Sequence, residues 1–197
     1  MTETPTPDLD LSALDRPRLA AYALACATHL QPLVRGWASP ATAAAVDDWL
    51  QRLWAGLGAG DGAGVGAVDA AAAEQVDAEV NEADEADADD SNSPAYYAMR
   101  AISAISYAAT AQYGEDAVEA AGWASDEAVD LLADLDVTLA STPPLAEVEA
   151  AAQAEAYALV SADPFDPAQV RAAAEAARIR DVLTAAVPAY AAARGWN

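Results

Sequence analysis

The chain has 197 residues, with 32 acidic side chains against nine basic ones, which gives a formal net charge of -23. All nine bases are arginine, and the chain holds one cysteine and one histidine. This composition excludes a disulfide framework within the chain, a lysine Schiff base and a P-loop. It also excludes binding to DNA or to an anionic membrane by bulk electrostatic attraction.

The length and the alanine content point to one helix-rich domain. A chain of nearly 200 residues suits a single domain with a sizeable core, and 57 of its residues are alanine. Residues 1 to 14 are acidic and rich in proline and threonine, and we predict a disordered arm there, followed by one helical domain over residues 15–197. No secretory signal and no membrane span is recognisable, so we expect a cytoplasmic protein.

The first half of the chain predicts three helices. Asp15 can cap a first helix, which Pro32 is expected to end or kink. Ser39 followed by Pro40 can start a second helix, which ends in a glycine-rich loop over residues 56–66. A third helix is expected over residues 68–86, and its acidic C-terminal end opposes the helix dipole.

The second half predicts four more helices. Ser93 with Pro94 starts a fourth helix over 94–113, which has one charged residue and is expected to be the most buried. A fifth helix over 115–139 should direct inward the residues Val118, Val129, Leu132 and Leu135, while Gly122 allows close packing or a kink. A sixth helix is expected over 145–161, and Asp166 followed by Pro167 can start a seventh helix over 167–193 with a kink at Pro188. The fold is therefore predicted to be an all-α, single-domain bundle of about seven helices with a buried central helix near 94-113.

The acidity is concentrated in the middle of the chain. Residues 53–170 have a formal charge of -23, residues 1–52 of -2 and residues 171–197 of +2. Acidic side chains four residues apart repel each other on a helix, and the arginines of the last segment, Arg171, Arg178 and Arg180, could relieve this repulsion. The candidate partner-binding residues, all carboxylates, are Glu82, Asp84, Glu85, Asp87, Asp89, Asp90, Asp126, Asp130 and Asp134.

Motifs that would indicate catalysis are weak. Cys26 and His29 share a face of the first helix, but a structural zinc site needs four ligands, so packing is the preferred interpretation. The spacing of Asp87, Asp89 and Ser91 resembles the start of an EF-hand, but Asn92 stands in place of the turn glycine. No catalytic residue, metal site or cofactor is predicted.

The layout of small and aromatic residues resembles the uncharacterised bacterial all-helical family typified by the YjaG protein. The resemblance covers about residues 17–197 and rests on the segments LAAYALACATHLQPLVRGWA, AVDDWLQRLWAGL, SPAYYAMRAISAISYAATAQYGEDAVEAAGWASDEAVDLL and RDVLTAAVPAYAAARGWN. The chain departs from that family in its glycine loop, its alanine surplus and its lack of lysine. The resemblance implies an all-helical fold and no particular activity.

Two functional hypotheses follow. The first is a non-catalytic interaction protein whose acidic middle segment docks a basic protein partner, without direct binding of nucleic acid or membrane. The second is an enzyme or small-ligand binder that uses carboxylates with a divalent metal. Adaptation to high salt or a biased genome composition would explain the acidity without any binding function.

Overall fold

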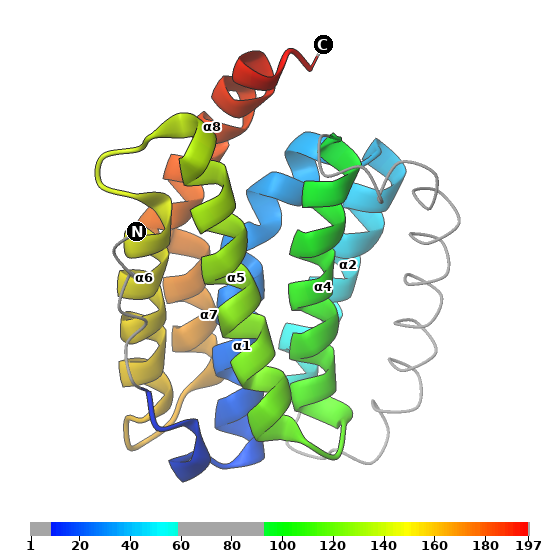
Figure 1. Ribbon diagram of the computed structural model, residues 1–197. Coiled ribbons are helices and arrows are strands. Elements are labelled where there is room, and N and C mark those ends of the chain that lie inside the picture. Colours follow the sequence, from blue (N-terminus) through cyan, green and yellow to red (C-terminus); the bar gives the residue numbers. More distant parts are fainter. Residues whose placement is uncertain (1–8, 59–92, 197) are drawn as a thin grey trace.

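The computed structural model describes residues 9–58 and 93–196, and this part of the chain is an all-α bundle without strands. A short 3-10 turn, η1 (Leu11–Ala13), precedes the helices. In chain order the helices are α1 (Arg16–Trp37), α2 (Pro40–Gly58), α4 (Pro94–Tyr113), α5 (Ala117–Leu139), α6 (Leu145–Val160), α7 (Pro167–Ala176) and α8 (Arg178–Arg194). Figure 1 shows them side by side, with the end of α8 extending beyond the bundle. The predicted third helix over 68–86 lies outside the described residues.

The central helix is α1. Every residue from position 19 to position 31 is buried, and α1 contacts every other helix of the described part. Alternating alanines let the neighbouring helices approach α1 on all sides, as expected for a helix without a solvent-facing stripe. α4 buries one face, so the expectation that it would be the most buried helix is wrong.

Capping side chains start four of the helices, as the sequence predicts. The carboxylate of Asp15 accepts a hydrogen bond from the backbone N–H of Arg18, at 3.2 Å. Ser39, Ser93 and Asp166 cap α2, α4 and α7 in the same way, each immediately before a proline. Each cap satisfies a backbone donor that a helix start leaves without an intrahelical partner.

Two prolines lie inside helices of the described part. α1 does not end at Pro32 but continues to Trp37, and α8 likewise runs through Pro188. The predicted seventh helix is instead interrupted at Ala177, whose backbone is extended (φ -60°, ψ 134°) and separates α7 from α8. The break therefore lies eleven residues before the predicted kink, at a position that carries neither proline nor glycine.

Residues 9–14 contradict the predicted disordered arm. Leu9, Leu11 and Leu14 pack against the core, and the hydroxyl of Tyr157 on α6 donates to the carbonyl oxygen of Asp10 at 3.1 Å. Their apolar side chains bury surface that the arm would leave in water. Residues 1–8 lie outside the described part.

An aromatic cluster packs the C-terminal turns of α8 against the end of α1 and the start of α4. It comprises Trp37, Tyr97, Tyr190 and Trp196, whose ring centroids lie 5.3–5.9 Å apart. The hydroxyl of Tyr190 donates to that of Tyr97 at 2.7 Å. Tilted and edge-to-face pairs at these distances are favourable contacts between rings.

In the described part of the chain, no helix is both long and apolar enough to cross a membrane.

Candidate functional site

Three of the predicted partner-binding residues lie on one side of α5. Asp126, Asp130 and Asp134 follow each other at four-residue steps and are exposed, as predicted. The other six candidates lie outside the described residues; they are Glu82, Asp84, Glu85, Asp87, Asp89 and Asp90. The described part of the candidate site is therefore a surface of α5.

Arg100 on α4 neutralises one end of this surface. Its guanidinium donates to Glu127, at 2.6 Å, and to Asp134. Burial lowers the pKa of Arg100, but the two carboxylates outweigh that effect and raise it above its ordinary value. In the sequence, Arg171, Arg178 and Arg180 are the arginines that could relieve the repulsion between these aspartates. The arginine that pairs with Asp134 is instead Arg100 of the neighbouring helix α4.

Asp126 and Asp130 keep their charges uncompensated. In the part of the chain that the structure describes, no arginine forms an ion pair with either carboxylate within 4.0 Å. Partial burial and the negative charge of Asp130 both raise the pKa of the Asp126 carboxyl. A cationic group of another molecule placed near this pair would meet two carboxylates that no arginine of the described part neutralises.

Three large apolar side chains are exposed on α5: Val118 and Trp123 precede Asp126 in the helix, and Val137, 86% exposed, follows Asp134. Trp123 is 47% exposed and Val118 is 44% exposed, so the expectation that Val118 faces inward is wrong. The ring of Tyr107 on α4 supports the Trp123 ring, with centroids 5.5 Å apart. We call the surface formed by Val118, Trp123, Asp126 and Asp130 the α5 outer face.

A buried polar network lies in the interior, where the sequence predicted only packing. Nδ1 of His29 on α1 lies 3.0 Å from both carboxylate oxygens of Glu149 on α6, and both side chains are almost completely buried. A buried carboxylate is costly unless its oxygens find donors. His29 is therefore a polar partner within the core, and the interpretation as a simple packing residue is incomplete.

Three more side chains extend the network from Glu149. Gln153 donates to a carboxylate oxygen of Glu149 and to the backbone oxygen of Ser125, each at 3.0 Å. The Ser125 hydroxyl donates to the amide oxygen of Gln153 and lies 3.1 Å from the hydroxyl of Tyr22. The network thus links α1, α5 and α6 through polar contacts at the centre of the bundle.

Cys26 lies beside this network and is fully buried, as expected for a small core residue. Burial, and next the negative charge of Glu149, raise the pKa of its thiol well above the ordinary value. A thiol held in its protonated form is a poor nucleophile and a poor metal ligand. We therefore interpret Cys26 as a core residue, and the neighbouring network as a set of polar contacts that join α1, α5 and α6.

The partners of His29 were missed because they are distant in the sequence. Glu149 lies 120 residues from His29, beyond the reach of helical spacing rules. One signal was nevertheless present, since Glu149 and Gln153 fall on the apolar stripe of α6 formed by Leu145, Ala146, Ala156 and Val160. Two polar residues on such a stripe indicate buried hydrogen bonding.

Comparison with known proteins adds no assignment. No protein-family model, curated protein or solved structure matches this chain significantly. The resemblance to the YjaG-like family accordingly stays a prediction. What the molecule itself defines is an all-α bundle with an acidic and partly apolar outer face on α5.

Proposed function

We propose that the protein is a non-catalytic interaction protein that docks a basic protein partner on the α5 outer face. The observation that carries this proposal is the exposed indole of Trp123 beside the unpaired carboxylates of Asp126 and Asp130. Tryptophan is highly buried on average in folded proteins, so an indole that is 47% exposed stands out on this surface. Tryptophan is also among the residues that contribute most to protein interfaces when buried.

The charges supply the second part of the recognition. Carboxylates without an internal cation attract arginine and lysine side chains of a partner, which speeds association and makes it sensitive to salt. The overall charge of -23 adds to this attraction at separations up to the screening length, which is about 8–10 Å at ordinary ionic strength. Val118 extends the apolar contact along the same helix.

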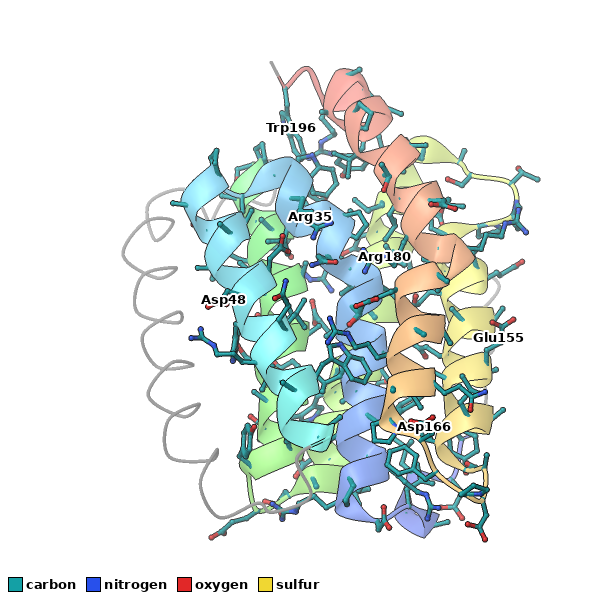
Figure 2. All side chains as sticks on the ribbon, turned by 180° about the vertical axis from the view of Figure 1, so that it is seen from behind. Arg35, Asp48, Glu155, Asp166, Arg180 and Trp196 are labelled. Atoms are coloured by element: carbon teal, nitrogen blue, oxygen red, sulfur yellow. The ribbon has the colours of Figure 1, made fainter. Side chains whose placement is uncertain are left out.

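The test compares three immobilised forms of the full chain for capture of basic proteins at low and high salt. The forms are the wild type, the double variant Asp126→Asn/Asp130→Asn, and a control that changes the charge equally, Asp48→Asn/Glu155→Gln. Asp48 lies on α2 and Glu155 on α6, both exposed and both away from α5 (Figure 2). We expect salt-sensitive capture by the wild type and the control, and loss of capture by the α5 variant.

A third variant separates the apolar from the electrostatic contribution. Trp123→Ala should weaken capture of the same proteins while leaving its salt dependence intact, because the carboxylates remain. Equal capture by all forms, or capture that is indifferent to salt, would remove the basis of the proposal. The predicted acidic segment around residues 82–90 is tested separately by changing its six carboxylates to amides.

The alternative, a carboxylate enzyme or ligand binder that uses a divalent metal, has no supporting observation. Among residues 9–58 and 93–196, no group of three or more histidine, cysteine, aspartate or glutamate side chains converges as metal ligands would. Asp126, Asp130 and Asp134 follow one another at four-residue steps along the exposed surface of α5. The proposed membership of the YjaG-like family is compatible with the all-helical fold and assigns no activity.

A further inference from the structure

A polar pocket lies on the side of the bundle seen in Figure 2, between α1 and α2 on one side and α7 and α8 on the other. Its volume is about 220 Å³. The polar residues that line it include Thr28, Gln31, Arg35, Asp47, Arg171 and Arg180. The pocket therefore gathers three of the nine arginines of a chain whose net charge is strongly negative.

Two of these arginines are already paired. Arg35 forms an ion pair with Asp47 at 2.9 Å, and Asp47 also accepts a hydrogen bond from Gln31 at 2.6 Å. Arg171 forms an ion pair with Glu175, which also lines the pocket, at 2.8 Å. Each pair cancels its own charge, so these arginines line the pocket without dominating its potential.

Arg180 is the exception. Its guanidinium donates to the carbonyl oxygen of Thr28 at 2.9 Å, and in the described part no carboxylate lies within 4.0 Å of it. Burial lowers the pKa of Arg180, and the positive charge of Arg35 lowers it further; these two effects outweigh the opposite effect of the carboxylates of Glu175, Asp47 and Asp181. Figure 2 shows Arg35 and Arg180 approaching each other from α1 and α8.

The formal charge of the lining is positive. Three guanidinium groups against the carboxylates of Asp47 and Glu175 leave +1, and Arg180, which has no carboxylate of the described part within 4.0 Å, is partly buried. A cation held in this way is stabilised by an oxyanion that accepts two parallel N–H bonds from the guanidinium fork. A ligand with one negative charge would bring the pocket to neutrality.

We infer that this pocket binds a small oxyanion of single charge, a carboxylate or a dihydrogen phosphate ion, with Arg180 as its principal ligand. The backbone oxygen of Thr28 fixes one edge of the Arg180 guanidinium and leaves other donors for the anion. The volume of about 220 Å³ leaves room for a compact ligand. This site is separate from the α5 outer face and does not depend on the proposed partner.

The experiment titrates the full chain with sodium acetate and, separately, with inorganic phosphate, at constant ionic strength maintained with chloride. Binding is followed by the NMR signals of the arginine Nε–Hε groups, of which the chain has nine. We expect the signals of Arg180 and Arg35 to shift saturably and those of Arg16 and Arg52 to stay unchanged. Saturation by acetate alone identifies a carboxylate site, and saturation by phosphate alone identifies a phosphate site.

Variants of matched charge complete the test. Arg180→Gln removes the unpaired charge but keeps an amide donor for Thr28, and it should weaken binding by about tenfold or more. Arg16→Gln removes the same charge from an exposed position at the start of α1 and should leave binding unchanged. Folding of both variants is checked by circular dichroism.

Two results would overturn the inference. One is the absence of a saturable shift of Arg180 in the wild type with either anion, which needs no variant. The other is an equal loss of affinity in both variants, because that result would show a response to the overall charge of the protein and no local site.

Discussion

Arg180 on α8 donates a hydrogen bond of 2.9 Å to the carbonyl oxygen of Thr28 on α1, across 152 positions of the chain. In a regular helix that carbonyl would accept from the backbone N–H four residues later, but that residue is Pro32, which has no N–H. The arginine therefore takes the place of the missing donor. This explains how α1 runs through a proline without ending there.

The replacement of a backbone donor by Arg180 can be measured as a coupling between two substitutions. Arg180→Ala should lower the free energy of unfolding by about 1–3 kcal/mol, because the Thr28 carbonyl loses its donor. In a Pro32→Ala background the same substitution should cost less, since the backbone N–H restored by that change can reach the Thr28 oxygen. Denaturant unfolding of the two single variants and the double variant gives the coupling.

Arg178→Ala is the matched control for that cycle, because it removes the same charge from an exposed neighbour on α8. It should change stability by less than about 0.5 kcal/mol in either background. Equal costs of Arg180→Ala with and without Pro32 would show that the hydrogen bond does not substitute for the helical one.

The contact between His29 and Glu149 predicts a large loss of stability when one partner is removed. Glu149→Ala leaves the imidazole of His29 and one N–H of the Gln153 amide buried without their acceptor, and we expect a loss of about 3–5 kcal/mol in the free energy of unfolding. Glu155→Ala removes an exposed carboxylate from the same helix and should change stability by about 0.5 kcal/mol or less. Similar small losses for both variants would show that the buried contact adds little.

Gly122 offers a stabilising substitution. A Cβ atom at this helical position would meet no atom within 4 Å, so the predicted role in close packing is wrong. Gly122→Ala should therefore raise the free energy of unfolding by about 0.5–1 kcal/mol through helix propensity alone. Thermal unfolding followed by circular dichroism measures the gain.

Gly36 is the contrasting position. A Cβ there would lie 2.4 Å from Cγ1 of Val187 on α8, so Gly36→Ala forces a branched side chain to move. Overpacking of this kind costs about 1–3 kcal/mol and offsets the propensity gain. A clear stabilisation by Gly36→Ala would contradict the close approach of α1 and α8.

The raised pKa of Asp126 predicts how its removal affects stability at different pH values. A carboxyl whose pKa is higher in the folded state than in the unfolded state disfavours folding when it is ionised. Asp126→Asn should therefore stabilise the protein at pH 7, by about 0.2–0.5 kcal/mol for a partly exposed like-charge pair. The gain should vanish as the pH falls below the ordinary aspartate value of 3.8, where both states are protonated.

Asp48→Asn provides the opposite sign for comparison. Asp48 forms an ion pair with Arg52 at 3.1 Å on the surface of α2, so its removal should cost a few tenths of a kcal/mol at neutral pH. Free energies of unfolding measured from pH 3 to pH 7 distinguish the two. An Asp126→Asn gain that persisted at pH 3 would show that charge repulsion is not its cause.

Local signals in the sequence were sufficient for the helices and their starts. A capping side chain before a proline marks a helix start through backbone hydrogen bonding within three residues, and this was correct at Asp15, Ser39, Ser93 and Asp166. The exposure of Asp126, Asp130 and Asp134 followed from the charges on one helix face. These features depend on neighbours in the chain, so they could be predicted.

Features that depend on packing between distant segments could not be predicted. The low charge of α4, in which Arg100 is the one charged residue, suggested the most buried helix, but α1 is more deeply buried because its alanines admit neighbours on every side. The pairing of Arg100 with Asp134 and of His29 with Glu149 depends on which helices become adjacent. Helical spacing says which face a residue occupies and does not say which helix that face meets.

The unbroken burial of α1 over residues 19–31 also bears on how the protein opens. A helix end or a surface loop can exchange its amide hydrogens through small local fluctuations, but a helix enclosed on all sides exposes its amides only when the bundle comes apart. The amides in the middle of α1 should therefore be the slowest to exchange with deuterated water. Their exchange rate would report the global free energy of unfolding of the native chain directly.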